Sequence, residues 1–596
     1  VSTEGRTANI SSSQHIFSSM LKLQKVEIQN FRSCKSLEVP LSSFTPLVGY
    51  NNAGKSNIMD AIHWVLHHGA LDKGDFCDPD ERVMVTAYVD GLSEEVLDGL
   101  SDIRRERIEP FVGDDGHFRF RRYQPDPSGT KGNIELEAYR LSPAEGEEQE
   151  WVESPTGLNK TIQTLFPEPI EVRAMEDAAE DIGKSKDTST IGQLIAEVLN
   201  PGAESVTDRL QNPIQALQDR LSADGDERLE ALDDLDEGAT EKVSEYFPGL
   251  EIKTHIPVPD AQDLFGDGTI RVIDKTSDEP RNVSSMGHGA QRSIQMALVH
   301  HLAEQSSTET EADTAKLVLI DEPELYLHPQ AVESVRKSLK DLSESHYQVI
   351  FATHSPLMIG EDDIPYTNVV RKSTIEGTKV RKRVVEAVEE VIEDKASQRK
   401  TLFNLQNGSR VLFSDKVLLM EGKTEDRLIP RLYEKVTGGT LQEDRIALVG
   451  FDGSGGIPKC YDILDTMGMN VRALVDLDFM FLDAIHNDLL DEEDPHIQSC
   501  RGKHVDGAPV LHASDGATHL ADRGVAETEI QRLHEKMKRQ GYWVWTDGAI
   551  EKHLGIDGKD ESAWAEFNEQ LKENDFENVV EDSDGVRALV EWLDDM

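Results

Sequence analysis

One stretch, GYNNAGKS at residues 49–56, constrains the fold of this chain more than any other part of its sequence. It fits the pattern GxxxxGK[ST] in full, after the apolar segment FTPLV and before SNIMDAIHWVL, whose apolar spacing is that of a helix. In such a strand–loop–helix, backbone amides of the loop and of the helix N-terminus bind phosphates. We expect Lys55 to reach the β- and γ-phosphates of ATP and the Ser56 hydroxyl to ligate Mg²⁺. The nucleotide-binding residues predicted here are Gly49, Asn51, Asn52, Ala53, Gly54, Lys55, Ser56 and Asn57.

An acidic pair ends a second predicted strand far downstream. In KLVLIDEPELYLHP, Asp321 and Glu322 follow an apolar run. We expect Asp321 to hold the Mg²⁺ through water and Glu322 to orient or activate the attacking water. FATHS then places His354 at the end of the next strand, where it can sense the γ-phosphate. Alone, an acidic pair at a strand end could equally be a helix N-cap, but the P-loop favours the catalytic interpretation.

Between these motifs, SSMGHGAQR (residues 284–292) opens a predicted helix. Ser285, Gly287 and Gly289 leave backbone amides open to an anion. In ABC-type ATPases, a loop at this place contacts the γ-phosphate bound on a partner head, although this copy departs from the common LSGGQ form. The order of the motifs is typical of ABC-type heads, and it predicts a homodimer or a higher homo-oligomer.

A second set of acidic residues follows in the C-terminal part. Glu421 ends a predicted strand in LLMEGKTEDRL, and Glu425 lies one helical turn later on the same face. ALVDLDF ends another buried strand with Asp476 and Asp478. Hard oxygen ligands at the carboxyl ends of adjacent parallel strands suit Mg²⁺ or Mn²⁺, which can activate water for phosphodiester cleavage. In a chain with 113 acidic residues, one such motif is weak, but the two together predict a metal site.

The segments VEIQNFRSCKSL, GHGAQR and DEPELYLHP resemble the RecF/SMC-related branch of ABC-type ATPases, and more closely the overcoming-lysogenization-defect (OLD) family. The second acidic set resembles a Toprim domain, and ATPase followed by Toprim is the order in the OLD family. The resemblance covers nearly the whole chain from Met20. It implies that Arg32 lies beside the nucleotide and that the C-terminal part is a nuclease, with Glu421 and Asp476 as the strongest ligands.

The resemblance also implies that further acidic and lysine residues complete the nuclease site. WVWTDGAIEKHLGIDGKD offers Glu551 as a metal ligand and Lys559 as an electrostatic stabiliser of the transition state. The competing residues are Asp547, Glu529 and Lys552.

The predicted fold class is α/β and multidomain: an ABC-type ATPase head with a helical dimerisation insertion, then a C-terminal Toprim domain. The insertion is acidic and gives two helices of about 30 residues, each ~45 Å long, too short for the arm of an SMC protein. The predicted parts are a disordered leader (1–19), the ATPase head (20–188 and 248–395), the helical insertion (189–247), a linker (396–412) and the Toprim domain (413–596).

The charge balance opposes simple nucleic-acid binding. The chain carries 113 acidic and 62 basic residues, a formal net charge of −51, which is the wrong sign for binding phosphates over a broad surface. DNA contacts would then need local basic patches, for which ordinary charged strand edges are the alternative. Two clusters offer such patches: Arg104, Arg105, Arg107, Arg119, Arg121 and Arg122, and Arg371, Lys372, Lys379, Arg381, Lys382 and Arg383.

The cysteines and the hydropathy of the sequence indicate the cellular compartment. Four cysteines lie far apart without a CxxC pair, which argues against a zinc site or a disulfide framework and fits a reducing cytoplasm. The sequence contains neither an apolar run of roughly 18 residues nor a secretory signal pattern, so no membrane association is expected.

The preferred function is an ATP-binding, metal-dependent DNA endonuclease or nickase of OLD type in defence against phage or other foreign DNA. The alternative is a RecF-like repair ATPase whose Toprim fold is not nucleolytic, and a primase or topoisomerase is disfavoured because neither accompanying module is seen. Because Gabija systems use a similar nuclease subunit, a helicase-like partner protein stays open.

Overall fold

The computed structural model describes most of the chain from Leu21 onward. The predicted leader (1–19), residues 396–408 of the predicted linker and much of the predicted insertion lie outside the described residues. The described residues are 21–127, 133–141, 149–153, 155–173, 213–223, 227–244, 246–247, 249–256, 258, 271–273, 280–306, 316–345, 347–394, 409–451, 453–505, 508–509 and 526–596.

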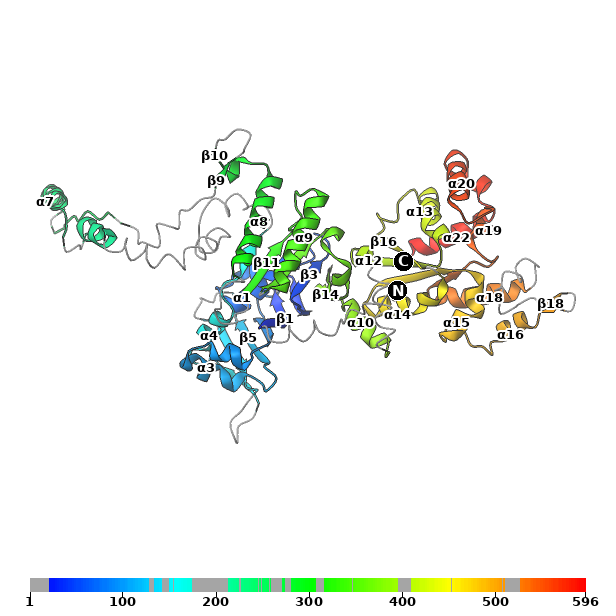
Figure 1. The fold of residues 1–596 in the computed structure, drawn as a ribbon, viewed down its shortest axis with the longest axis horizontal. Coiled ribbons are helices and arrows are strands. Elements are labelled where there is room, and N and C mark those ends of the chain that lie inside the picture. Colours follow the sequence, from blue (N-terminus) through cyan, green and yellow to red (C-terminus); the bar gives the residue numbers. More distant parts are fainter. Residues whose placement is uncertain are drawn as a thin grey trace, which may run out of the picture. The chain divides into compact units, whose positions relative to one another are not determined.

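The chain divides into two compact units (Figure 1). The first contains Val1–Leu47, Gly54–Met358 and Lys372–Lys379, and the second contains Val48–Ala53, Ile359–Arg371 and Val380–Met596. The P-loop therefore begins in the second unit and continues into the first. The domain boundaries expected from the sequence stay predictions.

An antiparallel sheet forms one part of the N-terminal half, with strand order β2-β1-β4-β5-β6-β7. Its strands alternate in hydropathy, as FRFRRYQ in β5 shows, so that one face packs on the core and the other carries charge. The strands are β1 (Lys22–Phe31), β2 (Cys34–Pro40), β4 (Val83–Asp90), β5 (Phe118–Gln124), β6 (Glu135–Tyr139) and β7 (Trp151–Glu153).

The nucleotide-binding motifs lie on a second six-stranded sheet, with strand order β14-β13-β3-β12-β11-β8. β11 pairs in parallel with both β12 and β8, and every residue of β3 and β12 is buried, as expected for strands covered on both faces. The strands are β3 (Phe44–Val48), β8 (Ile170–Val172), β11 (Lys316–Asp321), β12 (Tyr347–Thr353), β13 (Asn368–Ser373) and β14 (Gly377–Val380).

The helices of the first unit include three that position the motifs. α1 begins at Lys55 of the P-loop, α8 begins in the predicted signature loop, and α9 packs on β12 and on α8. α7 (Glu230–Ser244) is a described helix of the predicted insertion, whose role in dimerisation stays a prediction. The helices are α1 (Lys55–Leu66), α2 (Glu94–Asp98), α3 (Asp102–Ile108), α4 (Leu158–Leu165), α7, α8 (His288–Ser306) and α9 (Pro329–Glu344).

The C-terminal part is built on a four-stranded, wholly parallel sheet with strand order β16-β15-β17-β20. The strand–helix alternation predicted from the sequence is present. The strands are β15 (Lys416–Met420), β16 (Ile446–Gly450), β17 (Asn470–Val475) and β20 (Tyr542–Val544). The helices of this unit are α10 (Val384–Val391), α12 (Ser409–Leu412), α13 (Lys423–Thr437), α14 (Ile457–Thr466), α15 (Asp483–His486), α16 (Pro495–Arg501), α18 (Glu527–Arg539), α19 (Ile550–Leu554), α20 (Glu561–Glu573), α21 (Phe576–Val579) and α22 (Ser583–Asp594).

A continuous apolar core joins this sheet to its helices. Leu418 and Leu474 from the strands pack with Leu428 of α13, Trp564 of α20 and Leu589 of α22 in one buried cluster. This core fixes the carboxyl ends of β15 and β17, where the predicted metal ligands lie. Within the described part of the chain, no helix is long and apolar enough to cross a membrane.

Candidate functional site

The P-loop has a backbone that only glycine can provide at two positions. Gly54 caps α1 with a left-handed φ of 105°, and a Cβ there would lie 2.1 Å from Thr378 Oγ1. A Cβ on Gly49 would lie 2.3 Å from the carbonyl oxygen of Val370. Both glycines therefore allow the loop to fold tightly before the helix, in the form that leaves its amides facing a phosphate.

The side chains predicted around the triphosphate lie together. Lys55, only 5% exposed, places Nζ 2.8 Å from Nε2 of His354. Ser56 Oγ donates to Asp321 Oδ2 at 2.7 Å, as expected for two groups that share one Mg²⁺. His354 Nε2 also lies 3.1 Å from Glu322 Oε1, and burial together with the charge of Asp321 raises the pKa of Glu322. The five residues fit a magnesium nucleotide: a buried cation, a hydroxyl, two carboxylates and an imidazole.

Glu324, which was not predicted, holds the histidine in place. Its Oε1 accepts hydrogen bonds from Thr353 Oγ1 at 2.6 Å and from the backbone amide of His354 at 2.8 Å. The carboxylate thereby fixes the turn after β12 that carries the imidazole. The signal was present in the sequence as the last acid of DEPE, three residues after Asp321.

Arg292, the last residue of the GHGAQR segment, also acts on the acidic pair. It is fully buried, and its NH2 group donates to the backbone oxygens of Asp321 at 2.6 Å and Glu322 at 2.9 Å. Glu322 has a left-handed φ of 47°, a conformation that costs energy in a residue with a side chain. The hydrogen bonds from Arg292 stabilise this strained backbone and pack the signature segment against the acidic pair.

The three predicted signature residues lie at the start of α8. Ser285 Oγ donates to the Asn282 carbonyl at 2.7 Å. A Cβ on Gly289 would lie 2.8 Å from the carbonyl oxygen of Tyr326, so this glycine permits close packing, whereas Gly287 has open space around it. Contact of these residues with a nucleotide on a second copy stays a prediction.

Arg32 is engaged by two carboxylates. It donates from Nε to Asp75 Oδ1 at 2.8 Å and pairs through NH1 with Asp60 of α1. Burial alone would lower the pKa of Arg32, but Asp75 and Asp60 raise it. Asn57 donates to Ser33 Oγ at 2.7 Å, beside the same arginine. Both predicted nucleotide residues thus join α1 to the β1–β2 turn, and their contact with nucleotide stays a prediction.

Four predicted carboxylates lie at one end of the C-terminal sheet. Glu421 directly follows β15 and Asp476 directly follows β17, and the Asp476 amide donates to Glu421 Oε2 at 3.2 Å. Glu425 is in the first turn of α13, and Asp478 is three residues beyond the end of β17. The parallel pairing of the two strands brings these residues, 51–57 positions apart in sequence, to a common edge.

The electrostatics of this cluster are those of a cation site. Burial, with the charges of Glu421 and Glu425, raises the pKa of Asp476 to about 8. Burial, with Glu551 and Glu421, raises the pKa of Glu425 to about 7. Asp476 Oδ1 is buried and accepts no hydrogen bond from the described residues. A bound divalent cation would satisfy this oxygen and offset the repulsion, so the residues fit one. As they stand, no three His, Cys, Asp or Glu side chains of the described chain already form a metal-holding group.

The structure brings both weaker predictions, Glu551 and Lys559, to the same cluster. Lys559 Nζ lies 3.3 Å from Glu551 Oε2 and 4.0 Å from Asp476 Oδ2. Burial alone would lower the pKa of Lys559, but these two carboxylates raise it. Thr424 Oγ1 donates to Glu551 Oε1 at 2.6 Å, a contact that sequence reasoning did not find.

The competing residues have different surroundings. Glu529 accepts a hydrogen bond from Ser499 of α16 at 3.1 Å, and the amide of Asp547 donates to His553 Nε2 at 3.1 Å. Lys552 lies on α19 next to Glu551. The geometry therefore favours Glu551 and Lys559 as the residues that complete the cluster.

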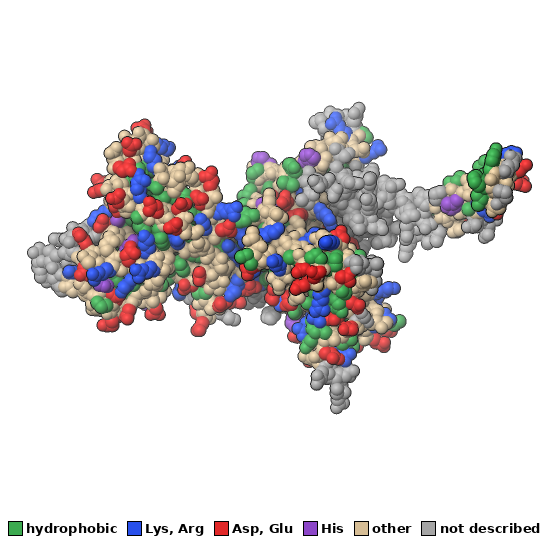
Figure 2. All heavy atoms as spheres, turned by 180° about the vertical axis from the view of Figure 1, so that it is seen from behind, with side chains coloured by type: hydrophobic (Ala, Val, Ile, Leu, Met, Phe, Trp, Pro, Cys, Tyr) green, Lys and Arg blue, Asp and Glu red, His purple; other side chains and the backbone are tan. Residues whose placement is uncertain are grey.

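The first predicted basic cluster is mostly neutralised inside the fold. Arg105 pairs with three acidic residues of its own helical region, and Arg121 pairs with Glu137. Arg122 is buried and donates to the Val65 carbonyl at 2.6 Å. Figure 2 shows Lys and Arg side chains interspersed with Asp and Glu over the visible face. Arg105, Arg121 and Arg122 are therefore held by groups of the fold itself, as in the charged-strand-edge alternative, and DNA contact by the rest of this cluster stays a prediction.

The second predicted basic cluster has the same character. Arg371 and Arg381 face Asp415, with Arg371 Nε at 2.6 Å from its Oδ1 and Arg381 NH2 at 3.8 Å. Lys382 pairs with Glu390. Lys379 and Arg383 pair with neighbouring glutamates as well. These cations stabilise local structure.

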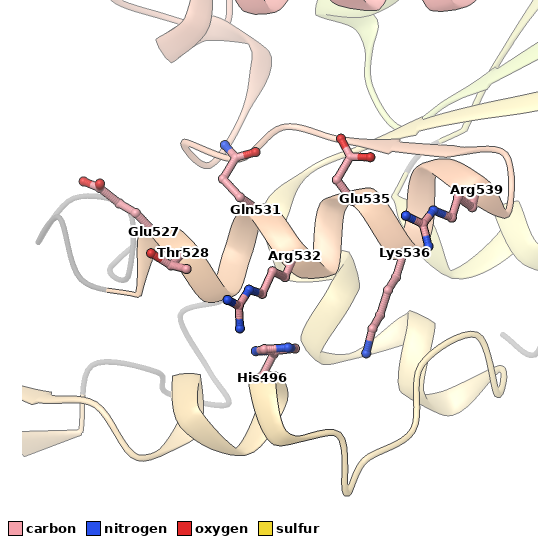
Figure 3. A pocket seen from close by; sticks show the side chains of 8 residues that line it. All are labelled: His496, Glu527, Thr528, Gln531, Arg532, Glu535, Lys536 and Arg539. Carbon is pink, nitrogen blue, oxygen red and sulfur yellow. The ribbon is translucent and has the colours of Figure 1, made fainter.

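A groove on the C-terminal unit has more accessible cations (Figure 3). It lies between α16 and α18, has a volume of about 610 Å³, and is lined on α18 by Arg532, Lys536 and Arg539 and on α16 by His496. Lys536 pairs with Asp494, whereas Arg532 and Arg539 form no ion pair with the described residues. In Figure 3 the Arg532 side chain points across the groove toward His496. Sequence reasoning did not find this groove, although Arg532, Lys536 and Arg539 recur at the spacing of one helical face.

Comparison with protein families matches two parts of the chain. Residues 44–360 match the family described as AAA domain, putative AbiEii toxin, Type IV TA system. Residues 412–478 match the Overcoming lysogenization defect protein-like, TOPRIM domain. The second match contains the four carboxylates at the ends of β15 and β17 and ends before Glu551 and Lys559.

Individual relatives cover most of the chain. It is 35% identical to the Old nuclease of Escherichia phage P2 over 96% of its own length and 100% of that protein. It is 23% identical to the OLD nuclease of Thermus scotoductus, over 80% and 88% of the two chains. Endonuclease GajA of Bacillus cereus is 22% identical, over 71% and 70%.

Among solved structures, the SMC head bound to the C-winged helix domain of ScpA covers 60% of this chain and 97% of its own, with 17% identity and a TM-score of 0.34. A likeness at this level carries no argument about function.

Proposed function

The chain belongs to the OLD nuclease family, and on that premise we propose that it is a metal-dependent DNA endonuclease whose cleavage is governed by its ATPase head. It combines an AAA ATPase domain with a Toprim domain and is an enzyme of the ATPase and nuclease classes. The dependence on Mg²⁺ or Mn²⁺, the DNA substrate and the role of ATP are the proposed parts.

One observation carries the proposal: Asp476 lies partly buried beside Glu421 and Glu425, and its buried oxygen Oδ1 accepts no hydrogen bond from the described residues. Such an arrangement is costly without a cation, because like charges in a poorly solvated site repel. A divalent cation held there supplies an activated water and charge compensation for phosphodiester cleavage. Lys559, close to both Asp476 and Glu551, can stabilise the negative charge that develops on the phosphate.

The proposal is tested with wild-type protein, supercoiled plasmid and three metal conditions: Mg²⁺, Mn²⁺ and excess chelator. We expect conversion to nicked or linear plasmid with either metal and none with chelator. Cleavage that persists in chelator would contradict metal dependence. No cleavage under any condition would favour the alternative below.

The proposed control by ATP has a physical route through Tyr50, which lies inside the P-loop. Arg371 and Arg445 lie over its ring at 4.6 and 4.3 Å from the centroid. Both arginines also hold Asp415, the residue directly before β15, at 2.6 and 3.2 Å. Burial alone would raise the pKa of Asp415, but Arg371, Tyr50 and Arg445 lower it. All four belong to the second compact unit, so a P-loop that shifts with nucleotide would displace the strand that ends at the metal cluster.

Replacing Asp415 by asparagine is expected to weaken this link. The variant keeps the side-chain size but loses the charge that holds both arginines, so the ratio of nicking rates with and without ATP should move toward one. Glu434→Gln, which breaks only the exposed pair with Arg431, is the matched control and should keep the wild-type ratio. An unchanged ratio in Asp415→Asn would contradict this route.

The groove of Figure 3 is the proposed DNA contact, because Arg532 and Arg539 form no ion pair within the part of the chain that the structure describes. A double alanine variant of these two arginines is expected to bind duplex DNA about tenfold more weakly. The plot of log K for DNA binding against log salt concentration should become less steep by about 2, since each lost phosphate contact contributes roughly 0.9 to the negative slope. The control removes Arg427 and Arg431, which have glutamate partners on the surface. Equal losses in the two double variants would count against the groove.

The biological role proposed is defence against phage or other foreign DNA, as a homodimer or higher homo-oligomer. Two relatives of this chain are the Old nuclease of Escherichia phage P2 and the more distant endonuclease GajA of Bacillus cereus. The activities in their names support nuclease chemistry. The alternative is a repair ATPase with a non-nucleolytic Toprim domain. The four assembled carboxylates speak against it, because a remnant fold has no need to hold acidic groups with raised pKa values at one edge of the sheet.

A further inference from the structure

A buried hydroxyl lies inside the predicted nuclease site without belonging to the carboxylate set. Thr424 stands in EGKTED, between Glu421 and Glu425, and is 4% exposed. Its Oγ1 donates to Glu551 Oε1 at 2.6 Å, across 127 positions of sequence, and Glu551 is 7% exposed. A short bond to a buried carboxylate is among the stronger hydrogen bonds in proteins, because it replaces water on a charged group.

This bond decides which oxygen of Glu551 faces the cluster. With Oε1 taken by Thr424, the other oxygen, Oε2, is directed toward Lys559 Nζ at 3.3 Å. Oε2 is buried and accepts no hydrogen bond from the described residues, the same condition as Asp476 Oδ1. Lys559 Nζ thus lies between two carboxylates, 3.3 Å from Glu551 Oε2 and 4.0 Å from Asp476 Oδ2, and each carboxylate is held by a different strand–helix junction.

Thr424 uses its hydroxyl differently from two other helical threonines, Thr437 and Thr164. Thr437, at the end of the same helix, donates to the Tyr433 carbonyl at 2.8 Å, and Thr164 donates to the Lys160 carbonyl at 2.9 Å. Both bonds stay within one helix, as is usual for helical threonines. The Thr424 hydroxyl instead joins α13 to α19, a bond between two elements that the sheet alone does not fix.

Two further contacts hold the segment around α19, on which Glu551 lies. Neither involves the Glu551 carboxylate. The amide of Leu477 donates to the Gly548 carbonyl at 2.8 Å, and His553 Nδ1 pairs with Asp582 at 2.6 Å. These contacts place the backbone of α19, whereas the rotation of the Glu551 carboxylate depends on Thr424.

We propose that Thr424 is a positioning residue of the nuclease site, which orients Glu551 so that Oε2 completes the ligand set for a divalent cation. The inference rests on the proposed function, since it assigns a task within that same site. Groups that orient metal ligands in this way typically change metal affinity by about 10–100-fold when they are removed.

The test compares Thr424→Val, which keeps the shape and removes the hydroxyl, with Thr424→Ser, which keeps the hydroxyl. Mn²⁺ is titrated calorimetrically into nucleotide-free full-length protein. The binding heat seen with wild type but absent with Asp476→Asn is assigned to the nuclease site. We expect Thr424→Val to bind Mn²⁺ about 10–100-fold more weakly and to need correspondingly more metal for half-maximal plasmid nicking. Thr424→Ser is expected to stay within about threefold of wild type.

Thr437→Val is the matched control, because it removes a hydroxyl from the same helix without touching Glu551. Its Mn²⁺ affinity should equal that of the wild type. Thr424→Ala serves as a second hydroxyl-free variant if valine does not fold, and thermal unfolding identifies that case.

The outcomes separate this inference from the function beneath it. Wild-type cleavage together with unchanged Mn²⁺ affinity in Thr424→Val and Thr424→Ala would overturn the role of Thr424 and leave the nuclease intact. Equal impairment of the serine and valine variants would assign the effect to packing and would also overturn it. A wild-type protein that neither binds Mn²⁺ at this site nor cleaves would refute the proposed function itself.

Discussion

Replacing Lys55 by alanine is expected to lower ATP hydrolysis by about 100-fold or more. The ammonium group is buried at the start of α1, 2.8 Å from His354, where we expect it to meet the phosphates. Phosphoryl transfer depends on such positioned charges, so the loss appears in turnover as well as in ATP binding. The measurement is phosphate release at saturating Mg²⁺ and ATP.

Lys337→Ala is the control for Lys55→Ala, because this lysine is exposed on α9. It should hydrolyse ATP at the wild-type rate. Hydrolysis by Lys55→Ala near the wild-type rate would show that GYNNAGKS does not bind the triphosphate in the expected way. The same variant also reveals the sign of the ATP effect on cleavage, since its nicking rate should no longer respond to the nucleotide.

Replacing Asp476 by asparagine is expected to reduce plasmid nicking by at least about 100-fold. The amide cannot match the anionic oxygen that Asp476 offers to a cation. The variant should fold well, because asparagine carries no charge that burial and the neighbouring Glu421 and Glu425 would disfavour, the causes that raise the pKa of Asp476. We therefore expect a metal-free unfolding temperature at or above that of the wild type, together with lost cleavage.

Manganese gives this prediction a second measurement. Mn²⁺ should raise the unfolding temperature of the wild type but not that of Asp476→Asn, because ligand that binds only the folded state stabilises it. Asp465→Asn, an exposed change on α14, should behave like the wild type in both assays. Equal cleavage by Asp476→Asn and wild type would remove this residue from the site.

The sequence predicted the parts of the two sites that rest on local patterns. A P-loop requires a strand before it and a helix after it, so its fold can be recognised within about twenty residues. Glu421 and Asp476 could be paired because parallel strands bring their carboxyl ends to one edge. The structure bears out this placement, and the contact from the Asp476 amide to Glu421 shows how near the two strand ends are.

Contacts between distant segments were beyond sequence reasoning. Arg371 and Arg381 of the second basic cluster, which the sequence offered as a possible DNA patch, hold Asp415, which follows them by more than thirty positions. A cluster of like charges in one segment says nothing about the acids that fold against it. The choice of Glu551 over Glu529 likewise needed the position of α19, and Thr424 offered no chemistry of its own that would mark it.

Cleavage of supercoiled plasmid by wild type and Glu421→Ala, in Mg²⁺ or Mn²⁺ with and without ATP, tests the central claim most directly. The claim is that the carboxylates after β15 and β17 form the nuclease site of this ATPase. We expect wild type to produce nicked or linear plasmid in at least one metal condition and Glu421→Ala to produce none in any. Nicking by Glu421→Ala at the wild-type rate, or an inactive wild type in every condition, would contradict the claim.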